Sequence, residues 1–509
     1  NDSPGSDDGL LNEPVAGITV GVKVRAGDLL DYVGDSGNAE ETPSHLHFEL
    51  HSPDGRVVNP YPHLLAASGA PVAQVEDALL LAYGSLPEMN ATAVVGQVDP
   101  GGGFAAGIWT HNDVAYLGTW GRAQACPASG VRLIDISDPA SPTATGAIAT
   151  GDEYPETDTD SVWAGAIDTD AFAGDIAVVA VSLCDNGESN RFRDAFRGLA
   201  LYDTSDPAAP ILLGTYHSGD RTQGVHEVDV VSRSDGSVLV AATVMQSYLH
   251  TDGELGDVRL VDISDPTNPR EVADWDYRES VVPINEMPPD VDEGHYHAHG
   301  VDFAGGGLRL WVAVWDGGVV LLDIDDPARP AISDSIEAVA SAEGNVHSVI
   351  SAPEFGLMVI SSEDLYPTAG GVHADGWGEQ LILDLAGEPL STFRPGDSDA
   401  DSESTIPLDG YHTAHNAQLV DQRLYSSWYS SGVRIVDLSD AVNPAEIGYF
   451  VPPPTADPQG YWIAPDGTVL IPMVWDVRVV DDLLYVSDMN TGLWIVRYTG
   501  DDPLGPDTY

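Results

Sequence analysis

One short pattern recurs along most of this 509-residue chain: an apolar run that ends in aspartate. In the clearest copies the run continues into Ser-Asp-Pro or a close variant. The aspartate, or the residue in its place, stands at positions 135, 203, 262, 323, 384, 437 and 497, at intervals of 53 to 68 residues. A period of this length, filled with short strands, is typical of propeller blades or of a comparable array.

Each copy divides into four short strands. The apolar run indicates a strand that is buried on both faces. The Asp-x-Ser-Asp-Pro segment indicates a turn, because aspartate bonds backbone amides and proline cannot extend a ladder. A hairpin precedes the run, as in residues 417–429, and a short outer strand follows it, as in residues 445–450. Four strands per copy predict a propeller blade.

The last copy ends after three strands, and residues 90–98 resemble the outer strands of the other copies. We therefore predict an all-β fold with a seven-bladed propeller over residues 90–509, closed by pairing of residues 90–98 with the last blade. Closure removes exposed sheet edges. Residues 1–72 are predicted to form a small β module and residues 73–89 a linker that is helical in part. An open solenoid or two sandwiches is the alternative to the ring.

The repeated segments, such as residues 130–139 and 257–266, resemble LVIVD repeats. The resemblance extends over most of residues 90–509. It implies a β-propeller of a kind found in secreted and surface-associated proteins of bacteria and archaea. A propeller fold by itself does not imply an activity, because propellers host unrelated functions.

The N-terminal module resembles part of a different family. Residues 24–37, followed by His45-Leu46-His47, are similar to the C-terminal half of lysostaphin-type zinc endopeptidases. That resemblance implies His47 as a zinc ligand and His45 as the catalytic base. The family also needs an upstream histidine and aspartate, and none of the 44 residues before His45 is histidine. One histidine cannot supply the usual three ligands, so we predict an inactive remnant unless a precursor completes the site.

Four histidines fall at the start of the innermost strand in four consecutive copies: His226, His299, His347 and His415. Innermost strands run along the central channel of a propeller, so these side chains are expected to form a ring at one mouth. Neutral imidazoles are good ligands for zinc, copper or iron. The ring is a candidate metal site, with His297 and His412 as donors that would orient the ligands. Alternatively, the ring histidines bond neighbouring backbone, and His297 and His412 are exposed loop residues.

A second candidate metal site lies in an acidic segment. Asp397, Asp399 and Asp401 alternate with small residues, as calcium-binding loops do. The segment lacks the glycine and the terminal glutamate of an EF-hand. Weaker candidates are Asp158 with Asp160 and Glu363 with Asp364. A solvated acidic surface is the alternative.

The two cysteines, Cys126 and Cys184, each end the second strand of adjacent copies. Both are then expected on one rim, where a disulfide between them is geometrically sensible. Two free thiols are the alternative.

The charge of the chain limits its partners. It has 20 Lys and Arg against 81 Asp and Glu, a net charge of −61. This repels nucleic acid and anionic membrane surfaces. It fits an extracellular or salt-adapted protein, or one that collects divalent cations. No apolar run is long enough to span a membrane. No signal peptide is visible at Asn1, so the sequence suggests a mature or trimmed product.

These features lead to two predictions of function. The first is a secreted or surface-associated module for binding, scaffolding or assembly, with a protein or a cell-surface polymer as partner and with oligomers allowed. The alternative is a metal-dependent oxidase or hydrolase that uses the histidine ring. Phosphate-binding loops and nucleophile elbows are missing from the sequence. Four residues near strand ends are expected on the same rim: Trp120, Trp315, Tyr429 and Asp488. We expect them to have packing roles, and the alternative is that they line a binding surface.

Overall fold

The computed structural model describes residues 50–51, 57–58, 87–120, 129–184, 195–220, 222–245, 256–281, 296–336, 345–364, 378–396, 410–454 and 472–500. The chain divides into two units, residues 1–78 and 79–509. In the first unit, β1 (Leu50–His51) and β2 (Val57–Val58) form an antiparallel pair. The predicted peptidase-like motif with His45 and His47 lies outside the described residues and stays a prediction.

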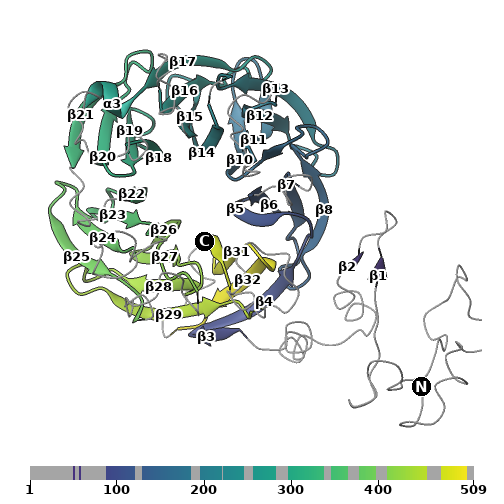
Figure 1. Cartoon of the computed structure of the whole chain (residues 1–509), viewed down its shortest axis with the longest axis vertical. Helices are drawn as coiled ribbons and strands as arrows, with labels where there is room; N and C mark the ends of the chain where they lie inside the picture. The colour runs from purple at the N-terminus through teal and green to yellow at the C-terminus, as the bar shows by residue number, and fades with distance from the viewer. Residues whose placement is uncertain are drawn as a thin grey trace, which may run out of the picture. The chain divides into compact units, whose positions relative to one another are not determined.

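The second unit is built from antiparallel sheets arranged radially around a common axis (Figure 1). Five sheets are separate blades, with strands given from the axis outwards. The first is β5 (Phe104–His111), β6 (Val114–Trp120), β7 (Val131–Asp135) and β8 (Thr143–Ile148). The next are β18 (Ala298–Ala304), β19 (Arg309–Val314), β20 (Gly318–Asp323) and β21 (Ala331–Ile336), then β22 (Val346–Ala352), β23 (Leu357–Ser362), β24 (Gln380–Asp384) and β25 (Pro389–Phe393). The last two are β26 (Ala417–Val420), β27 (Arg423–Ser427), β28 (Val433–Asp437), β29 (Ala445–Val451) and β3 (Glu88–Asn90), then β30 (Val474–Val480), β31 (Leu483–Asp488), β32 (Gly492–Tyr498) and β4 (Thr92–Val98).

The sixth sheet has nine strands and contains two runs of four. One run is β10 (Val162–Asp168), β11 (Ala173–Leu183), β12 (Gly198–Asp203) and β13 (Ile211–His217), and the other is β14 (Gly224–Ser232), β15 (Val238–Met245), β16 (Val258–Asp262) and β17 (Arg270–Trp275). They are joined where Ser182 of β11 pairs with Gly224 of β14, beside the short β9 (Thr157–Asp158). A four-residue helix, α3 (Tyr277–Ser280), follows β17.

The prediction of an all-β propeller with four-stranded blades is confirmed, but the predicted number of seven separate blades is wrong. The structure has five separate blades and one sheet that merges two runs of strands. The reason is the length of β11, which has 11 residues and continues beyond its own blade until it meets β14.

Closure by the N-terminal segment is confirmed. β4 pairs antiparallel with β32, as predicted for residues 90–98. β3, which the sequence placed mostly in the linker, adds a fifth strand beside β29. One segment therefore adds the outermost strand to two neighbouring sheets and covers the edges of β29 and β32.

The core lies between neighbouring sheets. The apolar runs are buried on both faces, as predicted: β12 is buried over its first five positions and β31 over its whole length. The aspartate that ends a run holds the following turn, since the Ser137 N–H donates to Asp135 and the Ser439 N–H donates to Asp437, at 2.9 and 2.8 Å.

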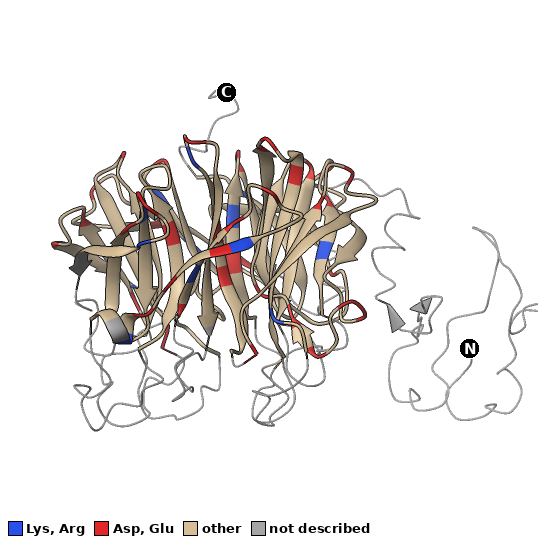
Figure 2. Ribbon diagram, turned by 90° about the horizontal axis from the view of Figure 1, so that it is seen from above, with Lys and Arg blue, Asp and Glu red and all other residues tan. Residues whose placement is uncertain are grey.

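Acidic residues are spread over the strands and turns of the propeller, with few basic residues among them (Figure 2). In the part of the chain that the structure describes, no helix has both the length and the apolar character needed to cross a membrane.

Candidate functional site

The innermost strands share a local irregularity that defines the candidate site. In five of the described inner strands the pairing register breaks at equivalent places: between Ala105 and Ile108, Val225 and Val228, Ala298 and Gly300, Val346 and Ser348, and Val474 and Asp476. A β-bulge adds an unpaired residue and re-aims its side chain. The residues inside these breaks include His226, His299, His347 and Trp475.

The structure brings the four predicted ring histidines together. The ring centroids of His226 and His299 lie 4.6 Å apart, those of His299 and His347 4.2 Å, and those of His347 and His415 4.0 Å. We call the row of these four histidines the histidine arc. The ring of Trp475 lies next to its end, with its centroid 4.4 Å from that of His415. All four histidines are buried. Residues far apart in the sequence therefore share one site because of the radial arrangement of the sheets.

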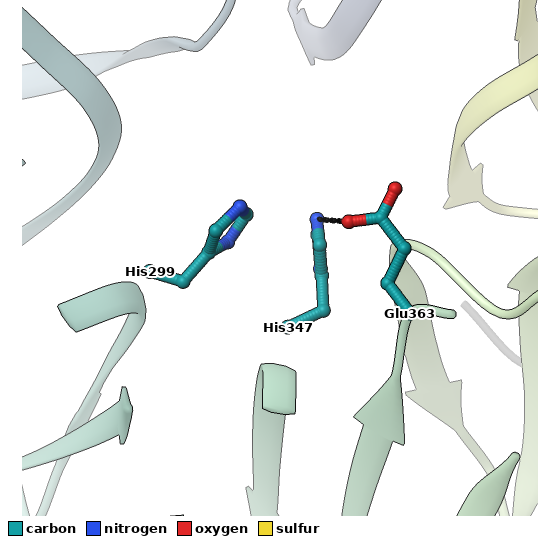
Figure 3. A group of neighbouring side chains, drawn as sticks. All are labelled: His299, His347 and Glu363. Carbon is teal, nitrogen blue, oxygen red and sulfur yellow. Dashed lines mark ion pairs between the residues drawn. The ribbon is translucent and has the colours of Figure 1, made fainter. Parts of the chain in front are cut away.

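A carboxylate completes this arc. Glu363 follows directly after β23, and its Oε2 atom lies 4.0 Å from Nε2 of His347. One ligand atom each of His299, His347 and Glu363 lie within 4.8 Å of one another. The three side chains point toward one another from neighbouring parts of the ring (Figure 3). Two histidines and one carboxylate at this spacing are a donor set for a transition metal.

Two of the histidines are oriented by acceptors at Nδ1. The His226 Nδ1 atom lies 3.0 Å from Oδ2 of Asp160, and the His415 Nδ1 atom lies 2.6 Å from the backbone oxygen of Trp475. At His415 the backbone acceptor places the proton on Nδ1 and leaves Nε2 with a lone pair, which is the usual arrangement for metal-binding histidines. At His226 the acceptor is a carboxylate, which favours the charged imidazole.

His347 is different, because neither of its ring nitrogens has a hydrogen-bond partner within the described residues, although its side chain is only 1% exposed. Nδ1 of His299 also lacks a partner there. Buried polar atoms are normally paired. His347, at the centre of the arc, is thus the histidine of the cluster whose two ring nitrogens both lack a hydrogen bond within the described residues.

Burial controls the charge of these groups. It lowers the pKa of His299 and His347 well below the ordinary value, and it lowers the pKa of His415 to about 3. Burial also lowers the pKa of His226, but the nearby Asp160 carboxylate more than offsets this and raises it to about 9. Burial raises the pKa of Glu363 to about 7. At neutral pH, three imidazoles are neutral and able to bind a metal, whereas His226 is charged.

The two flanking histidines are buried, so the alternative that they are exposed loop residues is wrong. His297 stacks on Trp315, with ring centroids 5.7 Å apart and 6.1 Å from His299. His412 is also buried, and its Nδ1 atom lies 2.8 Å from Oγ of Ser431. Their role as donors that orient metal ligands stays a prediction.

The rim residues expected from strand ends have mainly packing contacts. Trp315 lies 5.1 Å from His299, and Trp120 lies 5.6 Å from Trp475, between ring centroids. Asp488 holds its turn by accepting the N–H groups of Asn490 and Thr491. Tyr429 differs from these, since its hydroxyl donates to Glu363.

Glu363 is the site residue that the sequence reasoning missed. The sequence placed it only among weak calcium candidates, because the comparison of copies used the inner strands. The residue that directly follows the second strand of a blade gives a further signal: it is Trp315 after β19 and Glu363 after β23. Trp315 donates its N–H to His297, and Glu363 donates its N–H to Asn345, in each case two residues before a ring histidine. Aligning these strand ends places Glu363 on the histidine rim.

A cavity of about 280 Å³ lies in the channel beside the histidines. Its wall includes three carboxylates that each accept a backbone N–H from a neighbouring blade. Asp229 accepts from Phe303 at 2.8 Å, Asp302 from Ser351 at 3.2 Å, and Asp476 from Ile108 at 2.9 Å. Each of these side chains links two blades by its hydrogen bond, so their role in the structure is to hold neighbouring blades together.

The remaining predicted sites are largely outside the described residues. Cys184 is buried, but Cys126 is outside that part of the chain, so the disulfide stays a prediction. The same holds for calcium binding by Asp397, Asp399 and Asp401.

Comparisons with known proteins agree with the repeats. The LVIVD repeat model matches residues 125–150, 255–276, 309–337 and 473–496. A search of curated proteins finds no match. Among solved structures, the chain is similar to the crystal structure of the β-propeller domain of Cps50 (Swd1) from Myceliophteria thermophila, with 10% identity and a TM-score of 0.47, over 80% of this chain and 99% of that chain. The matched repeats, together with the radial sheets, make this chain a β-propeller repeat protein that carries LVIVD repeats.

Proposed function

We propose that this propeller binds one divalent transition-metal ion at the histidine arc, with His299, His347, His415 and Glu363 as ligands. The observation that carries the proposal is the pair of buried nitrogens of His347 that have no hydrogen-bond partner within the described residues. Burying a polar atom without a partner destabilises a fold by about 1–3 kcal/mol. A metal ion bound at one of these nitrogens offsets part of that penalty.

The chemistry of the donor set supports zinc, iron or copper. Imidazole nitrogen suits all three metals. Within the proposed ligands, His299, His347 and Glu363 form a set of two histidines and one carboxylate, which is characteristic of iron sites with open positions. The three histidine ligands are neutral at neutral pH and need not release a proton to bind the metal. Burial raises the pKa of Glu363 to about 7, so this carboxyl group releases its proton when it binds the metal. His226 stays outside the ligand set because Asp160 keeps its ring protonated.

A bound ion in such a site would polarise an oxygen ligand or activate water or dioxygen. This is the chemistry of the oxidase or hydrolase that the sequence suggests as an alternative. The binding or scaffold role, secretion and a protein or polymer partner stay predictions. Metal content separates the two functions, because a scaffold does not require an ion at this place.

Metal analysis of the full chain tests the proposal. The purified protein is stripped with chelator, reloaded with Zn²⁺, Fe²⁺ or Cu²⁺, dialysed, and its metal content is measured by mass spectrometry. We expect about one equivalent of metal, at least tenfold weaker binding in His347→Ala, and no change in His217→Ala. His217 is the matched control because its side chain is 43% exposed and lies away from the arc. Absence of binding for all three metals, or unchanged binding in His347→Ala, would overturn the proposal.

A further inference from the structure

Tyr429 is a bulky residue in a backbone conformation that bulky residues avoid. It lies in the turn between β27 and β28 with a φ of 45°, in the left-handed region that favours glycine. Residues in this state persist only where the surrounding structure holds them, and they cluster at functional sites. The contacts of Tyr429 therefore indicate what its strained conformation achieves.

Backbone and ring contacts fix the residue in place. Its carbonyl oxygen accepts the N–H groups of Gly432 and Val474, both at 3.0 Å. The ring is 2% exposed and packs edge-on against His415, with centroids 5.0 Å apart at an interplanar angle of 62°. It also packs against Trp475, at 6.0 Å and 88°. The phenol ring is thus held beside one of the proposed metal ligands.

The hydroxyl reaches a second proposed ligand. Oη of Tyr429 donates a hydrogen bond of 2.5 Å to Oε1 of Glu363. This bond runs from the blade that contains β27 to the blade that contains β23. The other carboxylate oxygen, Oε2, lies 4.0 Å from Nε2 of His347. The tyrosine therefore engages one oxygen of Glu363 and leaves the other toward the histidines.

We propose that Tyr429 is a positioning residue for the metal centre, whose hydroxyl holds Glu363 so that the carboxylate binds the metal through Oε2 alone. This inference rests on the proposed function. A glutamate side chain is long and flexible, and fixing it before binding lowers the entropy lost when the metal binds. Hydrogen-bond partners of metal ligands typically contribute 10–100-fold to metal affinity. The strained backbone at Tyr429 is the consequence of placing a phenol at this point.

Titration with Co²⁺, followed by its visible absorption, tests this role in the full chain. We expect Tyr429→Phe to weaken Co²⁺ binding 10–100-fold and to change the absorption spectrum, because the carboxylate can then turn and bind through both oxygens. Glu363→Gln should weaken binding at least as much. The double variant should match Glu363→Gln alone, since the hydroxyl acts only through the carboxylate. Tyr425→Phe, at a buried tyrosine of β27 outside the cluster, is the matched control and should bind like the unaltered chain.

The outcomes separate this inference from the proposed function. If the unaltered chain does not bind Co²⁺, or Glu363→Gln binds as tightly, the metal centre itself is wrong. If Glu363→Gln weakens binding but Tyr429→Phe leaves affinity and spectrum unchanged, only the positioning role is overturned, and Tyr429 is a packing residue. Circular dichroism checks folding. Glu363→Asp is a second variant that keeps Tyr429 and a carboxylate but shortens the reach to the hydroxyl, and unchanged Co²⁺ binding in it would also overturn the positioning role.

Discussion

Single carboxylates join neighbouring inner strands of the propeller. Asp302 accepts the Ser351 N–H and Asp229 accepts the Phe303 N–H, and each bond crosses from one blade to another. Burial raises the pKa of Asp302 to about 8 and that of Asp229 to about 6. Ionisation of these buried groups therefore destabilises the folded state. A neutral acceptor at the same place would accept the same hydrogen bond without this penalty.

Asp302 provides a test of this cost through the pH dependence of stability. Its pKa is raised in the folded state, so the folded chain retains a proton that the unfolded chain releases above pH ~4. The stability contributed by this group is complete below pH ~4 and is lost as the pH rises toward 8. Asparagine can still accept the Ser351 N–H. We expect Asp302→Asn to be similar to the unaltered chain at pH 4 and more stable at pH 8, by up to about 5 kcal/mol.

Chemical denaturation at pH 4, 6 and 8 measures this difference. Asp265→Asn, in an exposed turn, is the control for removal of one negative charge from a chain that carries −61. A stability gain that is equal in both variants, or that does not grow with pH, would contradict the role assigned to burial.

At the scale of elements, bulges position the candidate site. The register of β18 breaks between Ala298 and Gly300, and that of β22 breaks between Val346 and Ser348. These strands pass each other so closely that a Cβ atom on Gly300 would lie 2.6 Å from the backbone oxygen of His347. The glycine thus sets the spacing between the strands that carry His299 and His347.

A methyl group at this glycine should disturb both stability and site. We expect Gly300→Ala to destabilise the fold by about 1–3 kcal/mol, as overpacking does. It should also weaken metal binding, because β18 and β22 must move apart. Gly146→Ala is the control, since a Cβ atom there meets nothing within 4 Å. Thermal melting and metal titration of both variants check this expectation, which fails if the two substitutions behave alike.

The sequence predicts the elements better than it predicts their partners. Apolar runs and their aspartate turns identify the blades, and equal offsets in four copies identify the ring histidines. The merging of two runs could not be predicted, because it depends on the path of β11 and on one pairing, Ser182 with Gly224. Glu363 was missed because the copies were compared at their inner strands only, whereas its place follows from the ends of the second strands. Its hydrogen bond to Tyr429 could not be predicted from the sequence. Contacts made by side chains at loop ends need the three-dimensional path of the backbone.

At the scale of the whole molecule, the histidine arc depends on a closed ring. Closure uses β4, which pairs with β32, and β3, which pairs with β29. Without them the edges of β29 and β32 are uncovered, and uncovered strand edges favour association with other chains. The unit of residues 1–78 contributes nothing to these pairings among the strands described.

Two truncations test closure. A chain of residues 99–509 lacks β3 and β4, and the lost ladder of β4 with β32 alone comprises six residue pairs. At roughly 1 kcal/mol for each backbone hydrogen bond, we expect the free energy of unfolding to fall by about 5 kcal/mol or more, together with oligomers formed through the open edges.

A chain of residues 79–509 keeps both strands and is the control. Size-exclusion chromatography and thermal melting should show the control monodisperse with the melting temperature of the full chain. If the shorter chain melts at the same temperature and stays equally monodisperse, the N-terminal strands do not hold the ring together, and the arc of histidines must be kept in place by the remaining inter-blade contacts.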